Sequence, residues 1–294
     1  DPLSTPVKHR VICIQPIHAE GMKILHSRDD LEIIVPESTD PATWTNFLPG
    51  AEAICVRLSQ IPRSLIEKAP NLKIISRHGV GCDNIDVPAA TERGVIVATV
   101  GLANAPSVVE HTLALMLALA KRLFDRDRDV RNPADYMRKM KLDAQDIGGR
   151  TVLIIGLGRI GSRLAKTLNA LGLKCLGVDP AYSAEQITPM GCEPVSDWRA
   201  RLPEVDILTL HCPKTELTLG MVGAKELAAM KRTARLINCA RGGLVDEAAL
   251  IKALDTGQIA AAAFDVQVRE PLLANDPLLS VKNLILSPHS AAAT

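Results

Sequence analysis

The 294-residue sequence has few aromatic residues, because phenylalanine, tryptophan and tyrosine together make up 2% of it. Proteins that hold single-stranded nucleic acid stack the bases on aromatic side chains, so this composition argues against that class. The charge argues the same way, because 34 basic and 33 acidic residues leave a formal net charge of +1. A chain without a basic excess has no general attraction to nucleic acid or to anionic membranes. We therefore expect neither as a partner.

The seven cysteines also lack the patterns that would give them a role. None forms the C-x-x-C spacing of zinc sites or redox motifs, and their odd number does not fit a complete disulfide set. We expect reduced, buried thiols and no metal site. The first ten residues contain no apolar signal core, and the apolar run Thr112–Ala120 is much shorter than the roughly 20 residues that span a bilayer. A cytoplasmic protein is expected.

Length and apolar content favour two domains with large cores, since 47% of the residues are hydrophobic. In the first hundred residues, short apolar runs alternate with helical patterns. The expected strands are Val11–Gln15, Leu31–Val35, Ala53–Val56, Lys73–Ser76 and Val95–Ala98, and the expected helices are Glu20–His26, Pro41–Leu48, Pro62–Ala69 and Val87–Arg93. This alternation predicts a parallel sheet covered on both faces.

The most informative stretch runs from Thr151 to Asp179. It reads as a strand, the glycines of a G-x-G-x-x-G motif (Gly156, Gly158 and Gly161), a helix, and a second strand that ends on Asp179. The glycines allow a tight turn, a close approach of the backbone to a pyrophosphate, and close packing of helix on strand. A helix N-terminus at this point favours phosphate. The stretch predicts a dinucleotide site.

Asp179 lies 18 residues after Gly161. A carboxylate at this distance is suited to accept hydrogen bonds from a ribose 2′-hydroxyl, and it would repel a 2′-phosphate. The sequence therefore predicts NAD, rather than NADP, as the cofactor.

Between the first hundred residues and this motif lie a long helical pattern and a charged connection. The pattern at 106–123 begins with Pro106, which suits a first helical turn, and its apolar residues face every side. We expect a helix buried between domains or subunits. Glu110 and His111 near its start suit either a functional role or a polar role at the helix terminus. Residues 121–149 are expected to form a surface connection with some helix.

After Asp179 the alternation resumes, and polar residues follow several strands. Expected strands are Val205–Leu210, Arg235–Cys239, Ala260–Phe264 and Leu284–Leu286, and each is followed by a chemically informative residue: His211, Arg241, Asp265 and His289. The carboxyl ends of parallel strands meet at one edge of a sheet, where ligands of such sheets bind. We expect these side chains to gather beside the dinucleotide.

Seven segments in order make the sequence resemble the D-isomer-specific 2-hydroxyacid dehydrogenase family. They are GVGCDNID from Gly79, ANAPSVVEH from Ala103, GLGRIG from Gly156, HCPKT from His211, NCARGGLVDE from Asn238, FDVQVREPL from Phe264 and SPHSAAAT from Ser287. The resemblance implies two doubly wound parallel-sheet α/β domains. A flavodoxin-like substrate domain would cover 1–102, and its usual C-terminal helix would lie beyond 294. A Rossmann NAD-binding domain would cover 103–294, with a dimerisation helix near 106–123 and a homodimer as the assembly.

The resemblance also implies a catalytic trio of Arg241, Glu270 and His289. The chemistry of these residues agrees. An arginine fork suits a carboxylate, a histidine can exchange the hydroxyl proton during hydride transfer, and a glutamate can hold the other imidazole nitrogen. Formate-type members carry a glutamine where this chain has Glu270, so the acid favours a 2-hydroxy acid. The expected cofactor-binding residues are Gly156, Gly158, Arg159, Ile160, Gly161, Asp179, His211, Cys212, Pro213, Thr215, Cys239, Ala240, Asp265 and His289.

The expected substrate-binding residues are Arg57, Arg77, Val80, Gly81, Asn104 and Arg241. Arg57 and Arg77 follow neighbouring strands in a context similar to the 3-phosphoglycerate branch of the family, so a substrate with a second anionic group, phosphate or sulfonate, is the leading hypothesis. The alternative is that both arginines brace acidic side chains. The glycines between 79 and 86 suit an anion-binding turn, or a plain turn that Asp86 caps.

Two further interpretations remain open at this point. A dehydrogenase of the family could act on a simple substrate such as glycerate, glyoxylate or lactate. The same scaffold also serves as an NAD-sensing corepressor that binds peptides, which would make the chain a binding module rather than an enzyme. Turnover of small 2-hydroxy or 2-oxo acids separates these readings.

Overall fold

The computed structural model describes residues 8–293 except Pro16 and Leu102, and it divides into two compact units. The smaller unit extends to Asn104, and the larger unit runs from Ala105 onward. Each is described by itself.

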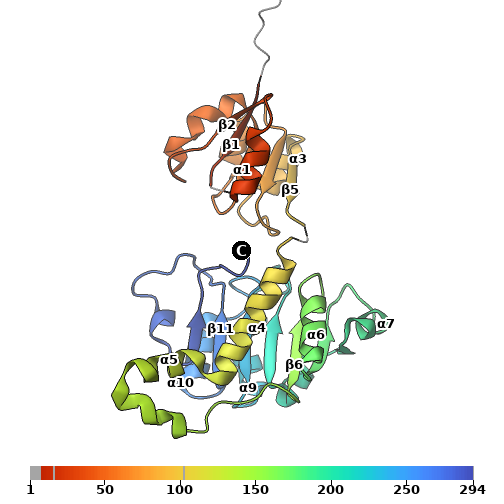
Figure 1. Ribbon diagram of the computed structural model, residues 1–294. Helices are drawn as coiled ribbons and strands as arrows, with labels where there is room; N and C mark the ends of the chain where they lie inside the picture. Colours follow the sequence, from red (N-terminus) through yellow and green to blue (C-terminus); the bar gives the residue numbers. More distant parts are fainter. Residues whose placement is uncertain (1–7, 16, 102, 294) are drawn as a thin grey trace, which may run out of the picture. The chain divides into compact units, whose positions relative to one another are not determined.

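The smaller unit is built on a five-stranded parallel sheet with the strand order β2-β1-β3-β4-β5 (Figure 1). Its strands are β1 His9–Cys13, β2 Leu31–Ile34, β3 Ala51–Val56, β4 Ile74–Arg77 and β5 Ile96–Thr99. All four strand pairings are parallel. The first strand, β1, lies inside the sheet, with β2 on one side of it and β3, β4 and β5 on the other, which is the flavodoxin-like order. The predicted doubly wound fold is confirmed here.

The helices of this unit are α1 Ala19–His26, α2 Arg63–Glu67 and α3 Val87–Glu92. The predicted helix Pro41–Leu48 is wrong in type, because the segment forms two 3₁₀ helices, η1 Pro41–Thr43 and η2 Thr45–Gly50. The break falls at Trp44, which has a φ of −138° and an indole that is fully buried in the core of the unit. The free energy gained by burying this large side chain outweighs the free energy gained by a regular α-helix here, because helical propensity is a weak preference.

The larger unit contains a seven-stranded parallel sheet with the order β12-β11-β10-β9-β6-β7-β8. Its strands are β6 Thr151–Ile155, β7 Lys174–Val178, β8 Glu193–Pro194, β9 Ile207–Leu210, β10 Arg235–Asn238, β11 Ala261–Phe264 and β12 Leu284–Leu286. The first strand, β6, pairs with β7 on one side and with β9 on the other, so the strand order reverses at β6. This is the Rossmann arrangement, and ligands bind at the reversal.

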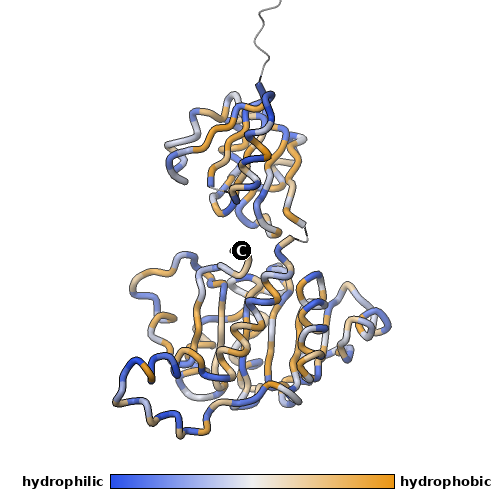
Figure 2. The backbone as a smooth tube through the Cα atoms, in the orientation of Figure 1, coloured by the Kyte–Doolittle hydropathy of each residue, from blue (hydrophilic) through white to orange (hydrophobic). Residues whose placement is uncertain are grey.

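Helices cover both faces of the larger sheet. They are α4 Ala105–Lys121, α5 Leu123–Arg131, η3 Pro133–Met140, α6 Gly161–Ala170, α7 Ala184–Ile187, η4 Thr188–Met190, α8 Trp198–Arg201, η5 Leu202–Glu204, α9 Ala224–Ala229, α10 Glu247–Asp255 and η6 Pro277–Ser280. The neighbouring residues Leu153 and Ile154 belong to different core clusters, because successive side chains of a strand point to opposite faces. The hydrophobic strands inside the unit are visible in Figure 2.

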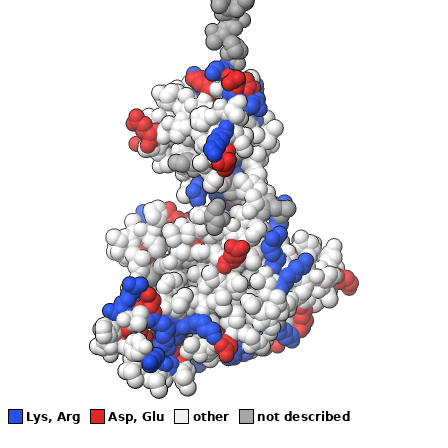
Figure 3. Space-filling view, in the orientation of Figure 1, with Lys and Arg blue, Asp and Glu red and all other residues white. Residues whose placement is uncertain are grey.

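Helix α4 packs against β10, β11 and α6, and its residues Met116 and Ala120 are fully buried. The following segment, α5 with η3, projects from the body of the unit (Figure 1). Basic and acidic side chains lie close together in this part of the molecule (Figure 3). They include the ion pairs of Arg126 with Asp129 and of Arg131 with Asp127. Within the part of the chain that the structure describes, no helix is long and apolar enough to cross a membrane.

Candidate active site

The turn after β6 has the conformation that its glycines were predicted to allow. Gly156 has a φ of +93°, and a Cβ atom there would lie 2.6 Å from the carbonyl carbon of His211. At Gly161, a Cβ atom would lie 1.9 Å from the carbonyl oxygen of Gly156. Any side chain at either position would collide with backbone, so both glycines are needed to bring the turn, the helix and the next strand together.

Gly158 differs from these two glycines. Among the described residues, no heavy atom lies within 4 Å of the position that its Cβ would take. Helix α6 begins three residues later, and no described side chain caps its N-terminus. Arg159 is exposed beside this opening and Ile160 is partly buried. Free backbone N–H groups at a helix N-terminus and an open approach over Gly158 fit a pyrophosphate.

Asp179 lies at the end of β7 and bonds to the glycine turn. Its Oδ2 accepts a hydrogen bond from the N–H of Leu157 at 2.8 Å, and its Oδ1 accepts one from Ala181 at 2.9 Å. The carboxylate is partly exposed, and each oxygen has further lone pairs for a ribose hydroxyl. Asp179 therefore both shapes the turn and presents negative charge beside it.

The loop after β9 brings His211 against the glycine turn. Burial lowers the pKa of His211 to about 4, so the imidazole is neutral near pH 7. Its Nε2 contacts the Thr209 hydroxyl at 2.8 Å, whereas its buried Nδ1 has no partner among the described residues. An orphaned polar atom at this place fits a site that a cofactor completes.

The other predicted residues of this loop follow directly. Burial raises the pKa of the Cys212 thiol to about 11, so Cys212 remains protonated. Thr218 donates to the carbonyl oxygen of Pro213 at 2.7 Å and accepts from the N–H of Thr215 at 2.8 Å. These bonds hold the loop in a compact turn at the carboxyl end of β9.

Arg241 follows β10 on a turn that Asn238 organises. The buried Asn238 side chain donates to the carbonyl oxygen of Arg241 at 2.9 Å and accepts from the N–H of Ala240 at 3.0 Å. Cys239 is buried between them, and burial raises its pKa to about 12. The Arg241 guanidinium donates to the carbonyl oxygen of Ala240 at 2.7 Å.

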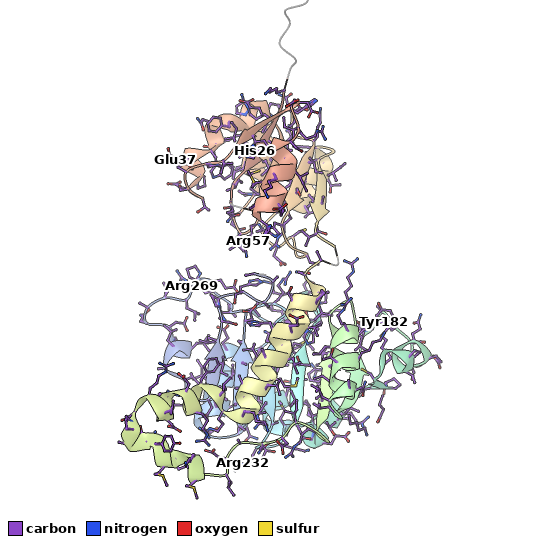
Figure 4. The ribbon with its side chains drawn as sticks, in the orientation of Figure 1. His26, Glu37, Arg57, Tyr182, Arg232 and Arg269 are labelled. Atoms are coloured by element: carbon purple, nitrogen blue, oxygen red, sulfur yellow. The ribbon has the colours of Figure 1, made fainter. Side chains whose placement is uncertain are left out.

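His289 and Glu270 form a direct pair. The Nδ1 atom of His289 lies 2.8 Å from Oε2 of Glu270, and Oε1 of Glu270 accepts from the N–H of Gln267 at 3.0 Å. The loop between β11 and β12 carries Glu270 at the carboxyl-end edge of the sheet, where Figure 4 labels its neighbour Arg269. Because a carboxylate only accepts, the Nδ1 atom carries the proton and the Nε2 atom is left as the basic nitrogen.

Electrostatics links Glu270 to Arg241. Partial burial acts to raise the pKa of Glu270, but the bonds from His289 and Gln267 and the charge of Arg241 outweigh it, and the net shift is downward. The backbones of the two loops are also in contact, since a Cβ on Gly242 would lie 1.8 Å from the carbonyl oxygen of Gln267. The structure thus brings the three predicted catalytic side chains to neighbouring loops, with Glu270 ionised.

Asp265 is 1% exposed, and its carboxylate bonds to the loop that carries His289. Its Oδ1 accepts from the N–H of Ser290 at 2.9 Å, and its Oδ2 accepts from the N–H of Ala291 at 2.9 Å. The predicted contact of Asp265 with the cofactor stays a prediction, whereas its support of this loop is a feature of the structure.

In the smaller unit, Arg57 and Arg77 stand at the carboxyl ends of β3 and β4, and Figure 4 labels Arg57 at that edge. Gln15 accepts from the N–H of Arg57 at 2.7 Å and so fixes the start of its loop. Burial, followed by the charges of Arg57 and Arg77, lowers the pKa of His78. Val56 and Arg77 are partners in the pairing of β3 with β4, so Arg57, Arg77 and His78 lie at neighbouring positions of this edge.

The adjoining turn contains the other predicted substrate residues of this unit. Val80 is exposed, Gly81 is partly buried, and Asn104 ends the unit in a partly buried position. Asp86 caps α3 by accepting a hydrogen bond from the N–H of Ala89 at 2.9 Å. The predicted capping role of Asp86 is therefore confirmed. The capping bond leaves the anion-binding reading of the preceding glycines open.

Sequence reasoning did not single out Gln267, Asn238 or Gln15. Each lies beside a predicted residue and braces a functional loop through side-chain or backbone bonds. An amide in an otherwise apolar strand end was the only available signal for Asn238, because a buried amide needs partners. Among the described residues, no group of three or more His, Cys, Asp or Glu side chains is placed to hold a metal ion.

Comparison with known proteins identifies related chains. Residues 113–291 match the family model described as D-isomer specific 2-hydroxyacid dehydrogenase, NAD binding domain. D-3-phosphoglycerate dehydrogenase of Archaeoglobus fulgidus is 39% identical over 286 residues, which is 97% of this chain and 54% of that protein. Glyoxylate reductase of Aeropyrum pernix is 36% identical over 292 residues, which is 97% of this chain and 87% of that protein.

A solved structure of D-lactate dehydrogenase from Aquifex aeolicus, in complex with NAD and lactic acid, superposes with a TM-score of 0.85 at 30% identity. The superposition covers 97% of this chain and 90% of that one. The chain spans about half the length of the phosphoglycerate dehydrogenases that it matches.

Proposed function

Because the chain belongs to the D-isomer specific 2-hydroxyacid dehydrogenase family, we propose that it transfers a hydride between NAD and C2 of a D-2-hydroxy acid or its 2-oxo acid. Bound NAD would supply the hydride acceptor or donor. The open approach over Gly158, the uncapped start of α6 and the orphaned nitrogen of His211 are the features that would hold it.

The observation that carries this proposal is the 2.8 Å contact between His289 and Glu270. With its proton on Nδ1, His289 offers Nε2 to the hydroxyl of the substrate and takes that proton as the C2 hydride leaves. The Glu270 carboxylate stabilises the resulting imidazolium and keeps the ring in the required tautomer. In the reverse direction, His289 returns the proton to the carbonyl oxygen.

Arg241 is the proposed partner of the substrate carboxylate. Its planar guanidinium matches a carboxylate through two parallel hydrogen bonds, which a lysine could not reproduce. The loops that carry Arg241 and Glu270 are in contact at Gly242 and Gln267, which supports a model in which the arginine and the His289–Glu270 pair act on neighbouring parts of one small molecule. A substrate with a carboxylate next to the carbinol carbon fits this combination.

The test is the initial rate of the purified protein with NAD or NADP and the 2-hydroxy acids 3-phosphoglycerate, glycerate and lactate, and with NADH or NADPH and the 2-oxo acid glyoxylate. We expect NAD-dependent turnover of at least one of them, and its loss in Arg241→Lys and His289→Asn. If NAD binds but no acid is turned over, the dehydrogenase proposal fails and the NAD-sensing corepressor reading replaces it.

For the substrate, we propose a second anionic group, such as the phosphate of 3-phosphoglycerate. The cations of Arg57 and Arg77 at adjacent strand ends, close enough to act on His78, support this choice. The bracing alternative predicts carboxylate partners for Arg57, and among the described residues its side chain forms no ion pair. The similarity to both phosphoglycerate dehydrogenases and a glyoxylate reductase makes substrate size the deciding question.

This substrate proposal is tested by Arg57→Ala and Arg77→Ala, with Arg28→Ala as the control. Arg28 pairs with Asp30 before the amino end of β2, away from the strand ends in question. Each test variant should lower kcat/KM for 3-phosphoglycerate about 10- to 100-fold, the range for lost hydrogen bonds to a charged group, and should leave lactate or glycerate nearly unchanged. Unchanged preference among the acids in both variants would show that the arginines serve the fold.

We also propose a homodimer, formed through α4 and the projecting α5–η3 segment. That short segment exposes several apolar side chains, among them Phe124 at 57%, Tyr136 at 48% and Met137 at 64% exposure, and a concentration of this kind favours a protein contact. Sedimentation should give a dimer, which Phe124→Glu with Met137→Glu dissociates. Leu217→Glu, at a residue elsewhere on this unit that is even more exposed, is the control. A monomeric parent protein would refute the assembly.

A further inference from the structure

A second contact between a histidine and a carboxylate lies behind the loop that carries His289. The Nε2 atom of His111, on α4, is 3.1 Å from the hydroxyl of Ser287 and 3.5 Å from Oδ1 of Asp265. Ser287 in turn contacts the same Asp265 oxygen at 2.5 Å. These three residues come from α4, from the end of β11 and from the start of the His289 loop.

The hydrogen-bond geometry fixes which atom of His111 carries a proton. A serine hydroxyl has one proton, and the contact of 2.5 Å commits that proton to the Asp265 carboxylate, which can only accept. The Ser287 oxygen is then an acceptor toward His111. Both contacts of the imidazole therefore require a proton on Nε2, so His111 acts as a donor whether the ring is neutral or charged.

The Asp265 carboxylate determines the course of the His289 loop. The carboxylate accepts from the N–H groups of Ser290 and Ala291. The main-chain carbonyl oxygen of Asp265 accepts from the N–H of His289 at 2.8 Å. His289 has a φ of +51°, a left-handed conformation that few residues other than glycine adopt without support. The loop thus wraps around one buried carboxylate.

A buried carboxylate needs donors on every side, and His111 is the only basic side chain recorded within 4 Å of Asp265 in the described part of the chain. His111 is also a polar contact between α4 and this loop. Removing it would leave Ser287 and Asp265 with one donor fewer and free the loop to shift. A shift of His289 by a fraction of an ångström is enough to misalign proton transfer.

We propose that His111 is a positioning residue of the reaction: through Ser287 and Asp265 it fixes the loop that presents His289 to the substrate. The inference rests on the proposed dehydrogenase function and adds a residue to it that does not touch the reacting atoms. What His111 contributes is the Nε2–H donor, so a side chain that offers an N–H at the same reach replaces it.

The kinetic test compares His111→Gln with His111→Leu. Glutamine keeps a donor at nearly the reach of Nε2, whereas leucine keeps only the bulk. We expect His111→Leu to lower kcat roughly 10- to 100-fold with KM for NAD changed less than about threefold, and His111→Gln to recover most of kcat. His26→Leu, which removes a histidine on α1 in the other unit, is the control. Equal kcat in the two His111 variants would overturn the proposal.

A mutant cycle with Ser287→Ala tests the route of the effect. If His111 acts through Ser287, the double variant His111→Leu/Ser287→Ala should be no slower than the slower single variant. Independent, multiplying effects would refute the route. If His111→Leu does not fold, His111→Gln with Ser287→Ala provides the same cycle.

A readout without turnover separates this inference from the proposed function. In ¹H–¹⁵N spectra of the histidine rings of the cofactor-free protein, His111→Leu should shift the His289 signals and leave those of His26 unchanged. Shifted His289 signals in a protein that turns over no acid would refute the dehydrogenase proposal alone. Unchanged His289 signals, with active parent protein, would refute the positioning role alone.

Discussion

Replacement of Gly158 by alanine should separate cofactor binding from folding. The added methyl group meets no described heavy atom within 4 Å, and the backbone of Gly158 is not left-handed. In the free protein the change is therefore neutral or stabilising by about 0.4–1 kcal/mol, because alanine restricts the unfolded chain. The same methyl group points into the open approach that a pyrophosphate would need.

Gly156→Ala is the matched comparison in the same turn. Its left-handed φ of +93° and the overlap with the backbone of His211 at 2.6 Å both oppose a side chain. A strained backbone conformation costs about 1–3 kcal/mol, and overpacking costs about 1–3 kcal/mol more. With about 2–4 °C of Tm per kcal/mol for a unit of this size, we expect a Tm lower by roughly 4–24 °C.

The assay measures Tm by circular dichroism and the Kd of NAD by fluorescence titration for both variants and the parent protein. Gly158→Ala should keep or slightly raise Tm while it weakens NAD binding by at least about tenfold, or 1.4 kcal/mol. If Gly158→Ala binds NAD as the parent does, the pyrophosphate does not cross this turn and the reasoning fails. A large loss of Tm in Gly158→Ala would contradict the described conformation of the turn.

Three other substitutions give distinct outcomes. Asp179→Asn removes the charge and keeps an acceptor oxygen for one of the two loop N–H bonds, so kcat/KM with NADP relative to NAD should rise about tenfold or more; an unchanged ratio in steady-state assays would exclude Asp179 as the selector. Glu270→Gln should lower kcat about 10- to 100-fold, since the residue orients His289, and parent-like kcat would remove Glu270 from the mechanism. Burial lowers the pKa of His211 from 6.5 to about 4, so the unfolded chain takes up a proton between these pH values and the folded chain does not. The free energy of unfolding, measured by urea titration, should then fall by up to about 3 kcal/mol as the pH drops through this window. His211→Gln should lose that part of the pH dependence. If the free energy of unfolding changes with pH equally in both proteins, His211 is not its source.

Local patterns determined much of the fold. The strand at Thr151–Ile155, the glycine turn and the strand that ends at Asp179 could be read directly, because the conformation of each depends mainly on near neighbours in sequence. The predicted helix at Pro41–Leu48 failed for the opposite reason. The burial of Trp44 is a tertiary interaction, and it overrode a local helical preference.

The sequence by itself also placed Arg241, Glu270 and His289 after successive strands, because the carboxyl ends of parallel strands share one edge. Only the tertiary structure decided how they are held. Glu270 uses both of its oxygens, and its ionised state depends on His289, on Gln267 and on the charge of Arg241. The pairing of His111 with Ser287 joins residues separated by 176 positions, and no periodicity reaches that far. Hydrogen bonds between distant segments depend on distances of a few tenths of an ångström, which the packing of the whole unit sets and which no local pattern encodes.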